Sequence, residues 1–229
     1  MPDAQFRPFD EPRRRRAAAF LPLARIEPME AYSLYATKLD AFLERLAPEG
    51  GKPDVPAIFH AVRNIRYASR GNRTPEAVLD NNEGSCSGKH ILLRDLLRRA
   101  GETADVEIVE GDFAAGMPEV ETMSEPLRRW VRDGGIHDFH NYVVWRGPVR
   151  ELKLDATWSD AMAPLGFPVN AGWAGEGDTQ LALEPYGVKM RVEDVIFHKG
   201  RLLTTLSEDE AEDRRAFLEL LTNWIAENQ

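Results

Sequence analysis

The chain has little of three features that would define its compartment and partners: cysteine, long apolar runs and excess positive charge. Its 229 residues include a single cysteine, so no internal disulfide can form and a reducing cytoplasm is the default expectation. No stretch is long and uncharged enough to predict a membrane-spanning helix. The net charge of −9 gives no electrostatic reason to expect a nucleic-acid ligand. We therefore expect a cytoplasmic protein with neither nucleic-acid nor membrane partners.

Positive charge is concentrated near the start of the sequence, in the run Arg13 to Arg16. The apolar stretch that follows is short, is interrupted by Pro22 and ends at Arg25, so it does not predict an export signal. The sequence predicts an arm or irregular lead-in over residues 1–28 and a single domain over residues 29–229.

Apolar spacing predicts helices in the first half of the chain, strands in the second and a closing helix. The class is therefore predicted as α+β with an antiparallel sheet. Two Pro/Gly-rich segments are expected to be loops near the functional cleft, the first with a short helix from Ser124. The predicted helices cover 28–46, 54–65, 75–79, 86–100 and a span after Ser207; the strands cover 104–109, 140–145, 150–155, 188–196 and 201–205; the loops cover 111–135 and 164–178.

Cys86 lies in the first turn of a predicted helix, with Ser85 as the expected capping residue. A helix N-terminus lowers the pKa of a thiol, because its unpaired N–H groups and the helix dipole favour negative charge. The small neighbours Gly84, Ser87 and Gly88 are expected to leave the sulfur approachable. Cys86 is therefore a candidate nucleophile, the alternative being a small buried apolar residue.

A nucleophilic thiol needs a general base, and His140 is the candidate. If the hairpin turn is centred between Gly147 and Pro148, His140 faces Asp155 across the two strands. The same register gathers apolar side chains on the opposite face, namely Val143, Trp145, Leu152 and Leu154. A carboxylate beside an imidazole orients it and stabilises its protonated form. The other histidines, expected to be structural or solvent-facing, are His60, His90, His137 and His198.

These residues resemble the transglutaminase-like cysteine enzyme superfamily, and bacterial members in particular, over residues 60–160. The resemblance rests on the order Cys86, His140, Asp155, on the Leu-Leu-Arg helix ending at Gly101, and on the segments Leu154 to Trp158, Ile65-Arg66-Tyr67 and Thr74-Pro75-Glu76. It implies a papain/transglutaminase-like fold, in which N-terminal helices place the nucleophile at a helix N-terminus against an antiparallel sheet. Many members carry an aromatic and an acidic residue where this chain has Ser85 and Gly88.

By this resemblance, Cys86 is the nucleophile, His140 the base and later the acid, and Asp155 the orienting residue. The implied reaction is acyl transfer or hydrolysis on a peptide, a protein glutamine or a small amide, through a thioester and without cofactor or metal. The oxyanion is expected to be held by the backbone N–H of Cys86 and by Asn82, with Asn81 nearly equivalent.

Two alternatives remain open at the level of the sequence. His137 and His140 form an H-x-x-H pair that Cys86 and Asp155 could complete as a metal site, although the second cysteine or histidine cluster typical of structural zinc sites is missing. The domain could also be a catalytically inactive transglutaminase-like binding or scaffold module.

Overall fold

The computed structural model describes residues 28–49 and 51–228, with side chains from residue 34. The predicted arm therefore lies outside the described residues, apart from Pro28. Four helices come first: α1 (Pro28–Leu46), α2 (Val55–Arg63), α3 (Pro75–Asn81) and α4 (Cys86–Ala100). Asp54 and Thr74 cap α2 and α3 by accepting from the N–H of Ala57 and Ala77, at 2.8 and 3.3 Å. These helices confirm the spacing predicted from the sequence.

Two short parallel strands hold the segment just before Cys86. Strand β1 (Arg66–Tyr67) pairs with β2 (Glu83–Gly84), so the chain leaving α3 is fixed against the chain leaving α2. Strand β2 ends two residues before Cys86, which fixes the start of α4 in space.

The main sheet has four antiparallel strands in the order β5-β4-β3-β6. They are β3 (Ala104–Asp112), β4 (His137–Arg146), β5 (Glu151–Leu154) and β6 (Glu184–Val192). Strand β5 pairs only with the second half of β4. The first half of β4, which carries His140, is therefore not paired with β5. The molecule is therefore a mixed α and β protein with an antiparallel sheet and several helices.

The register of the β4–β5 hairpin differs from the prediction by two residues. Val143 lies opposite Leu154 rather than Leu152, because β4 continues through Arg146 and the loop spans residues 147–150. Arg146 is held in line by its N–H bond to the carbonyl of Thr103, at 2.9 Å. Since side chains alternate along a strand, a shift of two leaves each on the predicted face.

The C-terminal third departs from the prediction after Val192. The strand expected at residues 188–196 is β6, which ends at Val192, and residues 201–203 of the strand expected at 201–205 belong to helix α6 (Val195–Leu203). Asp194 caps this helix by accepting from the N–H of Phe197 at 2.9 Å, and Val195 and Lys199 lie buried one turn apart. The run of branched apolar residues therefore reflects a helix face and not a strand.

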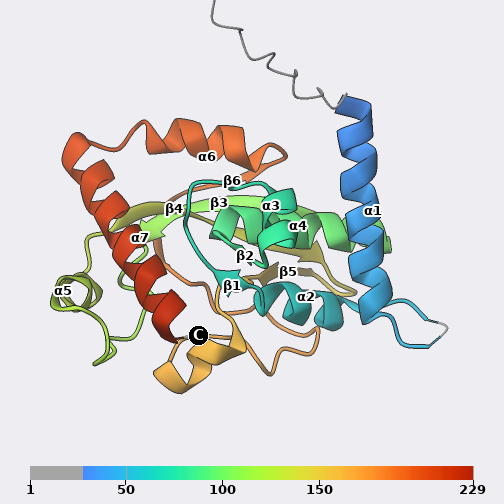
Figure 1. Cartoon of the computed structure of the whole chain (residues 1–229), viewed down its shortest axis with the longest axis horizontal. Helices are drawn as coiled ribbons and strands as arrows, with labels where there is room; N and C mark the ends of the chain where they lie inside the picture. The colour runs from blue at the N-terminus through green and yellow to red at the C-terminus, as the bar shows by residue number, and fades with distance from the viewer. Residues whose placement is uncertain (1–27, 50, 229) are drawn as a thin grey trace, which may run out of the picture.

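Other elements complete the second half of the chain. Helix α5 (Glu125–Asp133) follows Ser124 as predicted, and a 3-10 helix η1 (Asp160–Leu165) follows β5. Helix α7 (Glu208–Asn228) begins with reciprocal bonds between Ser207 and Glu210, as in a capping box. Figure 1 shows α7 crossing in front of one end of the sheet, α1 at the opposite side and α6 above.

Two apolar cores lie on opposite faces of the sheet, since alternate residues of β4 belong to different cores. The first packs α1, α2 and α4 against Val143 and Trp145. The second packs α5 and α7 against Tyr142 and Val144, and it includes Cys86. Within residues 28–49 and 51–228, no helix is long and apolar enough to cross a membrane.

Candidate active site

Cys86 is the first residue of α4, and its side chain is only 4% exposed. The small residues around it serve close packing and do not leave the sulfur open, which corrects the sequence-based interpretation. A Cβ on Gly84 or Gly88 would lie 2.5 or 2.7 Å from a methyl carbon of Val78, so only glycine lets α3 approach. Ser85 occupies the capping position, but its buried hydroxyl makes no capping bond. The first-turn N–H groups beside the sulfur therefore lack the expected side-chain acceptor.

His140, on β4, is joined to Asp155, which directly follows β5. Its Nε2 lies 2.7 Å from Asp155 Oδ2, and both side chains are buried. The observed register places Asp155 diagonal to His140 on the same face rather than directly opposite, still within reach of a hydrogen bond. Because Nε2 is engaged, Nδ1 is the nitrogen left for the thiol. This Nδ1 is buried and has no hydrogen-bond partner within the described part of the chain.

The Asp155 carboxylate is fixed by several donors. Oδ1 accepts from the N–H and hydroxyl of Thr157, at 2.9 and 2.5 Å, and Oδ2 also accepts from the N–H of Ala182 at 2.8 Å. Burial alone would raise the pKa of Asp155, but the charge and hydrogen bond of His140 hold that pKa well below its usual range. Asp155 is therefore an anion that orients the imidazole.

His90 has a structural role, one of the two expected for it from the sequence. The N–H of Ala156 donates to its Nε2 at 2.8 Å, which makes Nε2 an acceptor and places the ring proton on Nδ1. That Nδ1 then donates to the carbonyl of Cys86 at 2.7 Å. His90 thus ties the chain after Asp155 to the backbone of Cys86, and it is fully buried rather than solvent-facing.

Three charged residues at the site were not anticipated from the sequence: Lys199, Asp138 and Arg214. Lys199 Nζ, on α6, lies 3.4 Å from the Cys86 sulfur and 3.7 Å from an Asp138 carboxylate oxygen. Arg214, on α7, holds the same carboxylate with bonds of 2.8 and 3.2 Å. Lys199 and Asp138 are each about 2% exposed. The thiol therefore faces a buried cation held between α6 and β4.

Asn141, next to His140 on β4, also contacts the nucleophile. Its Oδ1 lies 3.8 Å from the Cys86 sulfur and accepts from the Ser87 hydroxyl at 2.9 Å. Its Nδ2 is buried without a hydrogen-bond partner in the described residues. A buried unpaired amide donor is costly unless a ligand uses it, so Asn141 is a candidate ligand-binding group.

The surrounding charges shift the pKa values of the pair in opposite directions. Burial alone would raise the pKa of Cys86, but Lys199 and then His140 outweigh it and lower the pKa to about 5. Burial would lower the pKa of His140, but Asp155 and then Cys86 raise it to about 9. Lys199 and Arg214 likewise lower the pKa of Asp138 to about 2 despite its burial. Between pH 5 and 9, the pair is therefore thiolate and imidazolium.

The remaining predicted residues lie apart from this cluster. Asn82 ends α3 in a left-handed conformation with an exposed side chain, and Asn81 is also exposed. His137, half of the H-x-x-H pair, instead bonds to Glu110 and Glu210 at 2.9 and 3.0 Å. It joins the sheet to α7.

Within the described part of the chain, the side chains that could share a metal ion are His90, His140 and Asp155, whose ligand atoms lie within 4.8 Å of one another. Most of their donor atoms are already engaged: His90 accepts from Ala156 and donates to the carbonyl of Cys86, while His140 Nε2 bonds to Asp155 and leaves only Nδ1. His137 is not part of the group. The donor set therefore fits a hydrogen-bonded triad better than a metal centre.

Comparison with known proteins leaves the family open. No family model matches the sequence, and no curated protein matches it significantly. A structural match is the 1.9 Å crystal structure of a protein from Cytophaga hutchinsonii described as a proposed cysteine protease, with a TM-score of 0.37 and 14% identity. The match covers 76% of this chain and 56% of that one, so this chain spans little over half of that protein. Likeness at this TM-score carries no argument for fold or activity.

Proposed function

We propose that the protein is a cysteine-dependent hydrolase or acyltransferase that acts on an amide through a thioester. The observation that carries the proposal is the buried His140–Asp155 bond of 2.7 Å, with the other imidazole nitrogen left for a thiol at a helix N-terminus. This is the relation of nucleophile, base and orienting acid that covalent catalysis requires. A papain/transglutaminase-like arrangement in one domain over residues 29–229 is part of the same proposal.

The reaction follows from the charge states of the pair. The Cys86 thiolate attacks the amide carbon, an S–C bond forms and the carbonyl oxygen becomes an oxyanion. His140 gives its proton to the departing nitrogen as the C–N bond breaks, which leaves a thioester and an amine. Water or a second amine then loses a proton to His140 and attacks the thioester, which releases the acid or new amide and restores the thiolate. A peptide, a protein glutamine or a small amide satisfies this chemistry.

The oxyanion needs donors close to the sulfur. The backbone N–H of Cys86 is one, because first-turn N–H groups have no acceptor within their own helix. For the second we favour Asn141, whose unpaired Nδ2 is buried beside Cys86, over Asn82, whose side chain is exposed. Asn141→Ala would then slow acylation more than it weakens substrate binding.

The proposal is tested by the rate of Cys86 alkylation with iodoacetamide as a function of pH. In the wild type, the rate should rise with a midpoint near 5, well below the free-thiol pKa of about 8.5. His140→Ala should move the midpoint upward, because the imidazolium that stabilises the thiolate is lost. His137→Ala is the matched control, since that histidine contacts Glu110 and Glu210 instead.

A midpoint at or above 8.5 that His140→Ala leaves unchanged would contradict the proposal. A low midpoint justifies a screen of amides with and without added amine, with mass spectrometry to detect the thioester on Cys86. Partner binding that survives Cys86→Ser, in a protein with no reactive thiol, would instead favour the inactive binding module.

A further inference from the structure

One cavity has mostly positive charged side chains in its wall, although the protein as a whole is negative. The cavity has a volume of about 410 Å³ and lies between α7 and the segment joining β1 to α3. The arginines in its wall are Arg70, Arg73, Arg214 and Arg215, against one carboxylate, Glu219. A chain with a net charge of −9 repels anions in general, so four arginines around one cavity form a local site of attraction.

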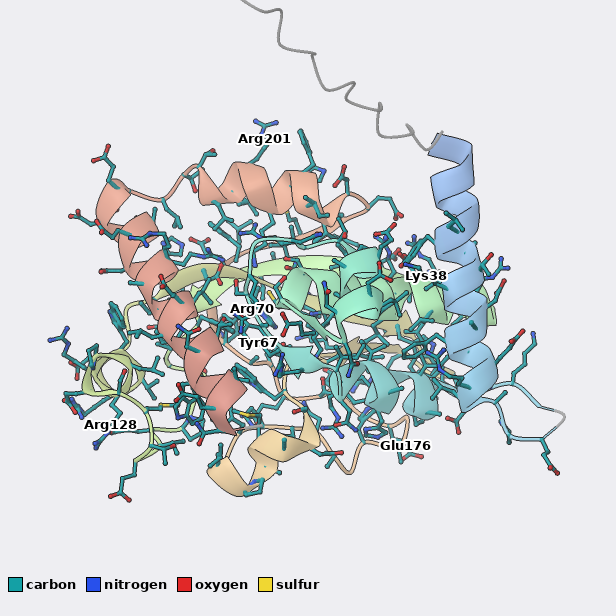
Figure 2. The ribbon with its side chains drawn as sticks, in the orientation of Figure 1. Lys38, Tyr67, Arg70, Arg128, Glu176 and Arg201 are labelled. Carbon is teal, nitrogen blue, oxygen red and sulfur yellow. The ribbon has the colours of Figure 1, made fainter. Side chains whose placement is uncertain are left out.

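Arg214 connects this cavity to the catalytic cluster. Its guanidinium lines the cavity and bonds to Asp138, whose carboxylate lies 3.7 Å from the Lys199 ammonium, itself 3.4 Å from the Cys86 sulfur. The two walls are also joined directly, because the N–H of Ser69 donates to the Thr222 hydroxyl of α7 at 3.0 Å. Tyr67 and Arg70 lie beside α7 in Figure 2, which shows the β1 segment reaching this helix.

The arginines differ in how far their charge is already compensated. Arg214 is paired with Asp138, and Arg70 with Glu83 at 3.2 Å. Arg215 has only Glu212 and Glu219, at 3.4 and 3.9 Å, all three on the exposed surface of α7. Arg73 has no ion pair with any residue that the structure describes. Arg73 and Arg215 are therefore available to a ligand.

We propose that this cavity, defined by Arg73, Arg214 and Arg215, binds an anionic group of the substrate next to Cys86. The inference deepens the proposed function, on which it rests, by naming the substrate class as amides that carry a carboxylate or phosphate. A guanidinium offers paired N–H donors that match either group. A volume of about 410 Å³ lies within the range of sites that enclose small molecules or side chains.

The test compares alkylation of Cys86 by iodoacetate, which is anionic, with alkylation by iodoacetamide, which is neutral. The ratio of the two rate constants is divided by the same ratio for a small free thiol, which removes the intrinsic difference between reagents. Arg73→Gln, Arg215→Gln and the double variant are compared with Arg128→Gln, which removes the same charge from α5. Using a ratio cancels any effect of a substitution on the thiol itself.

We expect a normalised ratio above one in the wild type that falls about threefold or more in Arg73→Gln and further in the double variant. It should also fall with rising salt, because exposed charges are screened beyond about 10 Å at 0.1 M. A ratio at or below one, or an equal fall in Arg128→Gln, would overturn the proposal. In either case, a Cys86 thiol whose alkylation has a low pH midpoint would still support the proposed acyl chemistry.

A second measurement decides the inference even if the thiol is inert. The arginine Nε–H signals are followed by NMR during titration with succinate and, separately, inorganic phosphate. Saturable shifts of Arg73 and Arg215, absent for Arg128, support the anion site, and the tighter of the two ligands identifies the group. Equal, non-saturating shifts of all arginines refute it. An inert thiol with saturable binding would reject the acyl chemistry and retain an anion-binding cavity.

Discussion

At the scale of single residues, Lys199 explains why a thiol with almost no solvent contact ionises easily. Its ammonium lies 3.4 Å from the sulfur in a buried setting, where charges interact more strongly than at the surface. Desolvation by itself favours the neutral thiol, and Lys199 is the largest influence opposing it. The Cys86 thiolate is therefore stabilised by a fixed cation as well as by His140.

Replacing Lys199 with methionine should move the alkylation midpoint of Cys86 upward, toward the free-thiol value of about 8.5, even with His140 in place. At pH 6, a midpoint moved from about 5 to about 7 would lower the thiolate fraction, and with it the rate, by about tenfold. Lys199→Arg should restore most of the low midpoint if the charge matters, whereas a packing role would leave both variants alike. Lys189→Met, on the exposed strand β6, serves as control.

The sequence was sufficient to predict that Cys86, His140 and Asp155 lie together, but not to predict the cations around them. A thiol in a first turn and a strand histidine facing an aspartate leave local signals. Lys199 is 113 residues from Cys86 and lies between two segments predicted as strands, so nothing local linked them. Asp138 does have a signal, since it lies two residues before His140 in the same strand.

At the scale of elements, the periodicity of apolar residues predicted which face of an element each side chain occupies. It was less successful at predicting strand register, or whether a segment is a helix or a strand. The β4–β5 register was wrong by two residues, yet His140 and Asp155 still meet because faces repeat every two residues. The turn offered no strong signal, because Gly147-Pro148 is compatible with several loop centres. Helix α6 was missed because its cap, Asp194, precedes branched residues that also favour strands.

His137 joins two elements, and its contribution to stability should depend on pH. Burial opposes protonation, but Glu210 on α7 and Glu110 on β3 raise the pKa of His137 above its ordinary value. A raised pKa in the folded state means that the stabilisation is complete below the unfolded value of about 6.5 and is lost as pH rises through the folded value.

His137→Ala should therefore lower the free energy of unfolding by about 1 kcal/mol at pH 6, and by less at pH 9. Urea denaturation of both proteins at the two pH values measures the difference. His198→Ala, on α6, is the control for removal of a histidine. A loss at pH 9 equal to or larger than that at pH 6 would show that the imidazolium does not hold α7.

At the scale of the whole molecule, the charges of the buried cluster also balance when Cys86 and His140 form an ion pair. Lys199, Arg214 and protonated His140 supply three positive charges; Asp138, Asp155 and the Cys86 thiolate supply three negative ones. The three cations come from three elements: His140 from β4, Lys199 from α6 and Arg214 from α7. Both helices pack against β4, so the packing of the C-terminal helices and the ionisation of the Cys86 thiol are linked.

This linkage predicts that the same leucine-to-alanine substitution in each of the two cores will affect the reactivity of Cys86 differently. Leu221 on α7 and Leu97 on α4 are each fully buried, the first in the core that contains Cys86 and the second in the other core. Leu221→Ala and Leu97→Ala should each lower the free energy of unfolding by roughly 2–5 kcal/mol, measured by urea denaturation.

Leu221→Ala alone should raise the rate of Cys86 alkylation under native conditions, because Leu221 packs in the core that contains Cys86 and its loss weakens the packing of α7 there. The rates are compared at matched fractions of folded protein, so that global unfolding contributes equally to both variants. If Leu97→Ala raises the alkylation rate as much as Leu221→Ala does, the reagent reaches Cys86 through fluctuations of the whole domain and not through movement of α7. If only Leu221→Ala does so, α7 controls the approach to the nucleophile.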